Sequence, residues 1–373
     1  MRVLVAPDKF KGSLTAAQVA AAVAAGIRSV LPDAAIDMVP VADGGDGTVA
    51  AALAAGYDEV PVAATGPTGS VVQTSYARCG DRAVVELADV SGLARLPDGL
   101  APLTATSRGT GEVIGAAVDA GCTEIVLGIG GSACTDGGAG LVRALGARLL
   151  SASGEEVGEG GAALADVASL DLSGLRLDGA RLTVACDVDN PLTGPAGAAA
   201  VYGPQKGATP EQVAELDAAL AHWADLVAAA TGHDHRDEPG AGAAGGVGFA
   251  AIALLGGRLR PGIDLVLELT GFHSRLAGAS LVVTGEGRLD EQTLRGKAPA
   301  GVAAAARAAG VPVVAVCGSN TLSPALLREA GIVAAYPLLE LEPDLDRCLT
   351  DGEALLRRVG ARIAADLAGL RST

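Results

Sequence analysis

The sequence predicts an α/β protein in which the two ends of the chain form one discontinuous parallel-sheet domain and a second α/β domain is inserted between them. Three observations support this prediction. Strand-like runs alternate with helical runs over the first sixty residues, short alternating strands follow over 59–90, and strand–helix alternation returns after residue 281. Strands that alternate with helices pair in parallel. We expect the parallel-sheet domain to comprise residues 1–65 and 278–373, and the inserted domain to comprise residues 66–277.

The N-terminal part contains two strand–helix units. The expected elements are a strand at 2–6, a helix at about 15–30, a strand at 36–41 and a helix at 49–55. Ser13 or Thr15 is a suitable N-cap for the first helix, and Pro32 lies just past its end. Each strand runs into a loop, and loops at the carboxyl ends of parallel strands are where ligands bind.

The rest of the chain begins with a predicted antiparallel meander from Glu59 to Val90, where turn signals separate short strands. The uncharged stretch from Pro239 to Gly257 is rich in Gly and Ala, which favours a loop leading into a buried helix over a membrane span. The other expected elements are strands at 124–129, 181–186, 281–284, 311–317 and 332–336, and helices at 111–120, after the loop 130–138, and at 211–230, 300–309, 324–329 and 352–370.

The composition excludes several classes of function. The formal net charge is −16, so attraction to nucleic acid or to an anionic membrane is not expected. Aromatic residues make up 2% of the chain, too few for base-stacking platforms. The six cysteines are scattered without a CxxC pair, and Met1 leads directly into a strand-like run that lacks a signal-peptide core. We therefore expect a cytoplasmic protein with reduced thiols.

The lysines are more informative than the net charge. The chain has 23 Arg but only four Lys, all in loops beside Gly, Pro or acidic residues: Lys9, Lys11, Lys206 and Lys297. Where only a solvated positive charge is needed, Arg replaces Lys easily, so the lysines that remain are enriched where a compact ammonium is required. Any single one of these lysines could simply be a solvated surface residue. The four together favour a binding or catalytic site.

Carboxylates lie in the same kind of loop. An Asp in a glycine turn often serves its own backbone hydrogen bonds, but six loops that combine glycine with a carboxylate or a lysine favour a site. Glycine loops that open helices can bind phosphate, and hard oxygen ligands beside lysines suit Mg²⁺-assisted phosphoryl transfer. The carboxylates are Asp8, Asp43, Asp46, Asp136, Asp187, Asp189, Glu286 and Asp290.

Other functions can be weighed against phosphoryl transfer. The segment 128–133 fits G-x-G-x-x-A after a strand, so an NAD(P)-dependent hydroxy-acid dehydrogenase is an alternative, although the acidic residue expected about 20 positions later is absent. A similar match at 240–245 follows a charged loop rather than a strand. The chain has no Walker or protein-kinase signature and no G-x-S-x-G elbow, and His233 and His235 lack the partners of a metal site. A non-catalytic sensor of small anions is a third alternative.

Six motifs in order along the chain resemble the bacterial type-1 glycerate kinase family. They are Ala6-Pro7-Asp8-Lys9-Phe10-Lys11-Gly12-Ser13-Leu14, Ala42-Asp43-Gly44-Gly45-Asp46-Gly47-Thr48, the Gly130–Gly138 loop, the 185–192 segment with 203–207, the 242–246 glycines, and 284–290 with Gly296-Lys297. The resemblance covers essentially the whole chain. It implies a Rossmann-like domain with an inserted domain, the glycerate kinase I fold, and ATP-dependent phosphorylation of D-glycerate, mostly to 2-phosphoglycerate. Phosphorylation of the 3-hydroxyl stays open.

The resemblance and the loops together give residue-level expectations. We expect glycerate and ATP as substrates, Mg²⁺ with ATP as cofactor, no nucleic acid or membrane partner, and a reaction in the interdomain cleft; a homodimer is left open. Asp187, Asp43 and Glu286 are alternatives for the roles of base and Mg²⁺ ligand. Asp187 is the preferred base because it ends a strand at a turn, and Lys11 and Lys206 complete the expected catalytic set. The expected substrate- or phosphate-binding residues are Asp8, Ser13, Asp43, Gly44, Gly45, Ser132, Asp136, Asn190, Arg288 and Lys297, and the expected metal ligands are Asp43, Asp46, Glu286 and Asp290.

Overall fold

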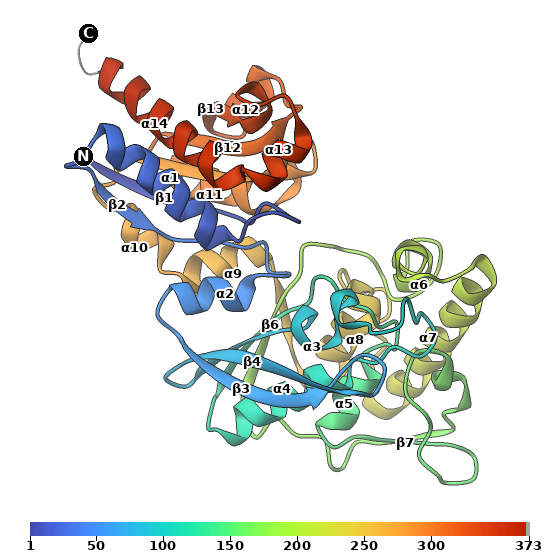
Figure 1. Ribbon diagram of the computed structural model, residues 1–373. Helices are drawn as coiled ribbons and strands as arrows, with labels where there is room; N and C mark the ends of the chain where they lie inside the picture. The colour runs from blue at the N-terminus through green and yellow to red at the C-terminus, as the bar shows by residue number, and fades with distance from the viewer. Residues whose placement is uncertain (371–373) are drawn as a thin grey trace. The chain divides into compact units, whose positions relative to one another are not determined.

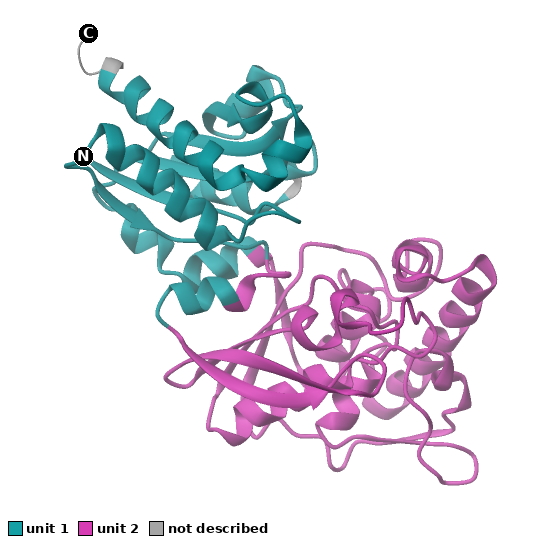
Figure 2. Cartoon of the chain, viewed as in Figure 1, with its two compact units in different colours: residues 1–43, 50–56, 263–373 teal, residues 44–49, 57–262 magenta. Residues whose placement is uncertain are grey.

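The computed structural model describes residues 1–370, and its packing divides the chain into two compact units (Figures 1 and 2). Unit 1 comprises residues 1–43, 50–56 and the chain from 263 onward, and unit 2 comprises residues 44–49 and 57–262. These units differ from the domain boundaries expected from the sequence. The strand at 58–65 pairs within the sheet of unit 2, and the helix at 262–269 contributes to the core of unit 1. The units are groups of residues that pack together, and they do not by themselves test the expected domain boundaries, which stay a prediction.

Unit 1 is built on a five-stranded sheet in the order β13-β12-β11-β1-β2, in which every neighbouring pair is parallel. The strands are β1 (Arg2–Pro7), β2 (Ala35–Met38), β11 (Leu281–Leu289), β12 (Val313–Asn320) and β13 (Ile332–Pro337). A parallel sheet drawn from both ends of the chain confirms the predicted fold class. The strand order reverses between β1 and β11, because β1 leads to β2 on one side while β11 leads to β12 and β13 on the other.

Helices cover both faces of this sheet, which explains why β1 is continuously apolar and buried from Val3 onward. Val3 and Val5 face a core shared with α1 and α14, whereas Leu4 and Ala6 face a core shared with α9, α10 and α11. Thr15 caps α1 through a capping box with Gln18, as the sequence predicts. The helices are α1 (Ala16–Val30), α2 (Thr48–Ala54), which begins in unit 2, α9 (Gly262–Leu269), α10 (Phe272–Leu276), α11 (Ala298–Ala308), α12 (Pro324–Glu329), α13 (Leu345–Thr350) and α14 (Gly352–Leu370).

Helices α1 and α14, far apart in sequence, lie side by side in Figure 1 and touch backbone to backbone. A Cβ added at Gly26 would lie 2.0 Å from the carbonyl oxygen of Arg357, and one added at Gly360 would lie 2.3 Å from that of Val23. Glycine lowers helix propensity, so these two residues reduce the local stability of their helices. In return, the absence of a Cβ allows the two helices to cross closely.

Unit 2 is built on a six-stranded sheet in the order β10-β9-β6-β5-β4-β3. Its first three strands in sequence pair antiparallel, which confirms the predicted meander, and β5, β6, β9 and β10 pair in parallel. A separate antiparallel pair joins β7 and β8. The strands are β3 (Asp58–Thr65), β4 (Val71–Cys79), β5 (Arg82–Glu86), β6 (Glu124–Gly128), β7 (Arg148–Leu150), β8 (Ser169–Asp171), β9 (Arg181–Ala185) and β10 (Arg258–Arg260).

One hydrophobic core holds the helices of unit 2 against its sheet. Trp223 is fully buried there, and its Nε1 donates to the carbonyl oxygen of Gly137 at 3.1 Å. The apolar stretch ending at Gly257 forms the largely buried helix α8, and among residues 1–370 no helix is both long and apolar enough to cross a membrane. The helices are α3 (Ala88–Ser91), α4 (Arg108–Asp119), α5 (Ala139–Ala144), α6 (Ala198–Tyr202), α7 (Pro210–Thr231) and α8 (Ala243–Leu255).

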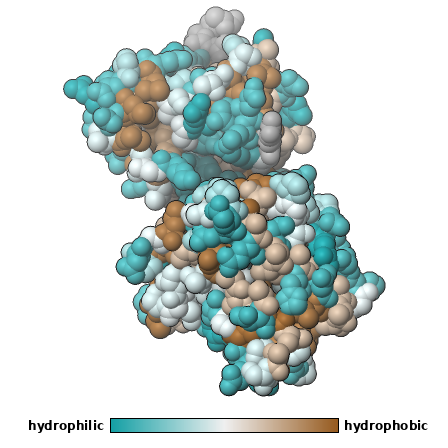
Figure 3. Space-filling model, turned by 90° about the vertical axis from the view of Figure 1, so that its right-hand side faces the viewer, coloured by the Kyte–Doolittle hydropathy of each residue, from teal (hydrophilic) through white to brown (hydrophobic). Residues whose placement is uncertain are grey.

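Five short 3₁₀ helices complete the described secondary structure: η1 (Leu93–Arg95), η2 (Ala162–Asp166), η3 (Pro204–Lys206), η4 (Thr293–Arg295) and η5 (Leu338–Glu340). On the face shown in Figure 3, hydrophobic residues are interspersed among hydrophilic ones on each unit. Scattered exposed apolar residues of this kind are normal for a protein in water.

Candidate functional site

The reversal of strand order in unit 1 marks a ligand-binding position. Ligands of open α/β sheets bind beyond the carboxyl ends of the strands at such a switch point. Pro7 of β1 pairs with Gly285 of β11, and the N–H of Asp8 donates to the carbonyl oxygen of Gly285 at 2.8 Å. The fold therefore places Asp8 and Glu286 next to each other at the switch point.

These two carboxylates and Asp43 form the acidic cluster of unit 1. Burial raises the pKa of Asp8 to about 7, the charges of Asp43 and Glu286 contribute in the same direction, and the Lys9 N–H, 2.6 Å from Asp8 Oδ1, opposes them. Burial also raises the pKa of Glu286, with smaller contributions from other carboxylates that include Asp43. The three groups thus share an environment in which added positive charge is favourable.

The acidic cluster suits a hard cation that a substrate helps to hold. Within residues 1–370, no three His, Cys, Asp or Glu side chains converge well enough to hold a metal ion alone. Mg²⁺ commonly takes one or two carboxylates and completes its shell with substrate phosphates and water. Asp43 and Glu286, two expected ligands, fit this pattern because their charges interact; Asp290 also raises the pKa of Glu286. Asp46, another expected ligand, belongs to unit 2, so its role as a metal ligand stays a prediction.

Cationic and hydroxyl groups surround the cluster. Lys297 Nζ lies 3.9 Å from Glu286 Oε2, and the buried Thr293 hydroxyl donates to Glu286 Oε1 at 2.6 Å. Lys297 is also the N-cap residue of α11. Arg288 has a largely exposed side chain, 3.5 Å from Asp290. This part of the expected site is brought together by the fold.

The loop after β1 presents Lys11 to solvent. Phe10 anchors the loop because its ring is buried and its N–H donates to the carbonyl oxygen of Leu14 at 2.8 Å. Lys11 follows as an exposed residue, and Gly12 turns the chain with φ +80°. Ser13 donates its hydroxyl to the carbonyl oxygen of Leu349 at 3.0 Å. This geometry favours a role for Ser13 in holding the loop.

In unit 2 the segment Gly44–Thr48 packs against the carboxyl ends of the parallel strands. Gly44 has φ +88°, and a Cβ there would lie 2.7 Å from Ala185 Cβ at the end of β9. A Cβ at Gly128, which ends β6, would lie 2.7 Å from the Gly44 oxygen, and one at Gly130 would lie 2.7 Å from Gly45 Cα. Glycine is required on both sides of this contact. Asp46 is exposed at its surface.

Lys206 lies beneath the 130–138 loop rather than on the surface. It is 2% exposed, and its Nζ donates to Ser132 Oγ at 2.9 Å and to the carbonyl oxygen of Cys134 at 2.5 Å. Burial lowers the pKa of Lys206, whereas Cys134 and Asp136 act in the opposite direction. The fold brings Lys206 and Ser132 into contact, and this geometry favours an organising role for both. Their expected roles in catalysis and in substrate binding stay predictions.

Asp136 is fully buried, and its carboxylate accepts hydrogen bonds from the segments on either side of it. The Ser107 N–H and hydroxyl both donate to Oδ2 at 2.8 Å, and the N–H groups of Gly138 and Gly140 donate at 3.1 and 3.2 Å. Burial raises the pKa of Asp136, and these hydrogen bonds oppose the shift. Such a carboxylate shapes the loop, and its direct contact with a substrate stays a prediction.

The turn after β9 carries the expected base. Asp187 is exposed, and its Oδ1 accepts the N–H of Gly262, at the start of α9, at 2.8 Å. Asn190 donates to the carbonyl oxygen of Ala196 at 2.8 Å and accepts the hydroxyl of Tyr202 at 2.6 Å. The carboxylate of Asp187 therefore has a fixed orientation at the protein surface, and the amide of Asn190 braces the turn.

The sequence did not single out Glu86, which the structure places against the Gly44–Thr48 segment. It is 3% exposed and accepts N–H groups from Gly47 and Val49. Its neighbourhood in sequence is strand-like and lacks glycine, so the loop motifs could not reveal it. Its position as the last residue of a parallel strand was the available signal.

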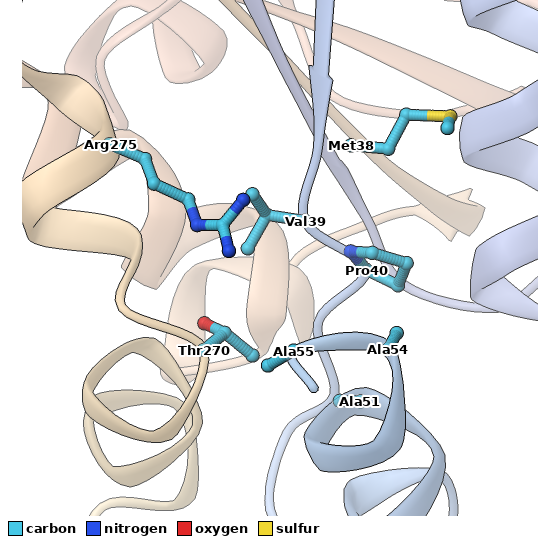
Figure 4. A pocket seen from close by; sticks show the side chains of 8 residues that line it. All are labelled: Met38, Val39, Pro40, Ala51, Ala54, Ala55, Thr270 and Arg275. Carbon is cyan, nitrogen blue, oxygen red and sulfur yellow. The ribbon is translucent and has the colours of Figure 1, made fainter. Parts of the chain in front are cut away.

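A shallow surface hollow in unit 1, with no enclosed room for a water molecule, contains none of the expected site residues (Figure 4). Met38, Val39 and Pro40 line one side of it, and Figure 4 shows the guanidinium of Arg275 directed toward Val39. The Thr270 hydroxyl donates to the carbonyl oxygen of Val266 at 2.8 Å. The lining offers one cation and no carboxylate, so it does not suit a metal-assisted reaction.

Comparison with known proteins agrees with this geometry. A sequence model described as the glycerate kinase family matches residues 3–368. The chain belongs to the glycerate kinase family. It is 46% identical over 373 residues to a glycerate kinase of Bacillus subtilis (strain 168), covering 98% of each chain. It is 44% identical over 379 residues to glycerate 2-kinase of Escherichia coli (strain K12), covering 100% of each.

A solved structure shares the fold. The crystal structure of a protein provisionally assigned as glycerate kinase 2, from Salmonella typhimurium LT2, matches with a TM-score of 0.87 at 44% identity over 100% of both chains. The predicted family, fold class and kinase activity are thereby confirmed. The dehydrogenase reading of residues 128–133 is not supported, because Gly128 and Gly130 serve close packing against Gly44 and Gly45.

Proposed function

We propose that this member of the glycerate kinase family transfers the γ-phosphoryl group of ATP to D-glycerate and forms 2-phosphoglycerate with the help of Mg²⁺. Family membership supports the reaction class, and a relative of equal length is named glycerate 2-kinase. The observation that carries the proposal for this chain is the acidic cluster at the switch point of unit 1, with Lys297 beside it.

In unit 1, Asp43 and Glu286, with Asp290 near them, would hold Mg²⁺, which when bound neutralises negative charge on the polyphosphate. Lys297 and Lys11 supply compact positive charges to phosphate or to the glycerate carboxylate. Asp8 stays within the cluster, where its raised pKa keeps part of it protonated near neutral pH. A protonated carboxyl can donate a hydrogen bond to a substrate oxygen.

In unit 2, Asp187 accepts the proton of the attacking hydroxyl. The hydrogen bond from Gly262 fixes the direction of its carboxylate, and a positioned base contributes at least about 100-fold to a rate. The glycine segment 44–48 and the loop around Ser132 contribute backbone groups and rigid surfaces to substrate binding. The expectation that the reaction takes place in an interdomain cleft stays a prediction.

The decisive experiment measures ADP release with D-glycerate as acceptor, in the presence of Mg²⁺ and again with EDTA. We expect release that depends on both glycerate and Mg²⁺. Phosphorus NMR of the product separates the 2-phosphate from the 3-phosphate, and a 3-phosphate product would correct the regiochemistry alone. ATP turnover that is independent of glycerate would reject the proposed substrate.

A further inference from the structure

Glu86 is a buried carboxylate whose two oxygens both accept backbone N–H groups from the segment that carries Gly44, Gly45 and Asp46. Oε1 accepts the N–H of Gly47 at 2.9 Å, and Oε2 accepts the N–H of Val49 at 3.1 Å. Glu86 ends strand β5, and its neighbour in the sheet register is Gly128, which ends β6. It therefore joins the rigid sheet of unit 2 to the loop.

The surroundings of Glu86 are unfavourable for a charge. Burial raises its pKa to about 7, the charges of Asp89 and Asp46 contribute in the same direction, and the two N–H groups act against them. A buried carboxylate costs stability unless hydrogen bonds compensate for its lost hydration, so the two N–H donors account for its presence here. A residue that served packing alone would have no reason to be ionisable here.

Two converging donors explain the residue type. A carboxylate offers an acceptor at each oxygen, whereas the Gln side chain would turn an NH₂ group toward one of the two N–H donors. Asp is one methylene shorter and could not reach both from the same position. The donors of Gly47 and Val49 thus select glutamate.

The loop that Glu86 holds has little room to move toward the sheet. Gly128 and Gly130 approach Gly44 and Gly45 so closely that a Cβ on either would lie 2.7 Å from a backbone atom of the loop. The Thr48 hydroxyl donates to the carbonyl oxygen of Gly45 at 2.7 Å and tightens the turn. Close packing sets the depth of the loop, and Glu86 sets its position along the strand ends.

We propose, building on the proposed function, that Glu86 is a positioning residue for phosphoryl transfer: by accepting the N–H groups of Gly47 and Val49 it holds the Gly44–Thr48 segment in the conformation that binds substrate. Glu86 touches no reacting atom in this proposal. It acts through the backbone of Gly44 and Gly45 and through the carboxylate of Asp46.

The test compares Glu86→Gln and Glu86→Asp with Glu112→Gln. Glu112 is a matched control in the same unit, since its carboxylate accepts the N–H and the hydroxyl of Thr65 at 2.6 and 2.9 Å. We expect kcat/KM with ATP and glycerate to fall about 10-fold to 100-fold in both Glu86 variants, the scale of a misplaced binding group. Glu112→Gln should stay within about twofold of the wild-type value.

Hydrogen–deuterium exchange of the peptide spanning residues 44–54 provides a readout that does not depend on turnover. Both Glu86 variants should exchange faster there than the wild type, and Glu112→Gln should not. A Glu86 variant with wild-type kcat and KM in its folded fraction, whatever its Tm, would overturn the proposal. If the Gln variant does not fold, Glu86→Asp carries the same comparison, and rapid exchange at Gly47 and Val49 in the wild type would itself overturn the proposal.

The outcomes separate this inference from the proposed function. If the wild-type protein fails to consume ATP with glycerate, the proposed function is rejected. Hydrogen–deuterium exchange of residues 44–54 then still reports whether Glu86 fixes the loop. Wild-type turnover with unchanged Glu86 variants rejects the positioning role alone.

Discussion

At the scale of single residues, depth in the fold decides what a charged side chain can do. The sequence places Lys206 in the expected catalytic set because it stands in a loop of Gly and Pro. The structure buries it, with Ser132 and Cys134 as hydrogen-bond acceptors. Lys297 stands in a similar loop and stays beside the acidic cluster. A motif records residue type and spacing but not burial, so the sequence could not tell these two lysines apart.

Asp187→Asn tests the expected base. Asn keeps an acceptor oxygen for the N–H of Gly262, so we expect a Tm close to that of the wild type. It cannot take up a proton from the attacking hydroxyl, so kcat should fall about 100-fold or more. Asp189→Asn, an exposed carboxylate in the same turn, serves as the control and should change kcat little. A loss of only a few-fold in the Asp187 variant would remove it from the role of base.

Asp8 predicts a pH dependence of stability. Its pKa is raised from 3.8 to about 7, chiefly by burial. Between these values the unfolded chain has lost the proton that the folded chain retains, so the free energy of unfolding falls as the pH rises through this window, by up to about 4 kcal/mol. Asp8→Asn removes the titrating group and should flatten the profile measured by urea unfolding. The exposed Asp33→Asn is the control, and an unchanged slope in the Asp8 variant would contradict this account.

At the scale of secondary-structure elements, the alternation of strands and helices along the chain predicted the parallel sheet of unit 1, in which β1 contributes buried residues to a core on each face. Elements that depend on tertiary contacts could not be predicted in the same way. Helix α9 begins at Gly262, which binds Asp187, and α8 includes Ala244, Gly245 and Gly246 in left-handed conformations. Glu86 escaped detection for a related reason, since its hydrogen-bond donors lie about forty residues earlier in the sequence.

The crossing of α1 and α14 yields a prediction about stability alone. Ala is favoured over Gly inside a helix by about 1 kcal/mol, but a Cβ at Gly360 would lie 2.3 Å from the carbonyl oxygen of Val23. Forcing the helices apart typically costs about 1–3 kcal/mol, so Gly360→Ala should lower the free energy of unfolding. Gly115, inside α4, is the control because its Cβ would have its nearest neighbour at 3.8 Å. Gly115→Ala should be neutral or stabilising, and urea unfolding of both variants measures the difference.

At the scale of the whole molecule, the net charge is −16, and the carboxylates that produce it fall into two groups. Surface carboxylates pair with arginines, as Glu124 does with Arg82 and Arg181, and such pairs contribute little to stability. Other carboxylates gather at the switch point, where burial raises the pKa values of Asp8 and Glu286. An acidic protein can therefore bind anionic substrates, provided that a cation and the loop lysines neutralise this cluster locally.

Mg²⁺ and ordinary salt should consequently affect stability differently. With ADP present, we expect MgCl₂ to raise Tm more than NaCl at matched ionic strength, because a cation bound only by the folded state stabilises it by mass action, about 1.4 kcal/mol at ten times its Kd. Glu286→Gln should lose this excess, since it removes a carboxylate of the cluster. Glu124→Gln removes one charge outside the cluster and should keep it. Equal effects of the two salts on wild-type protein would show that the cluster binds no Mg²⁺ with ADP, and the metal would then have to enter with other ligands.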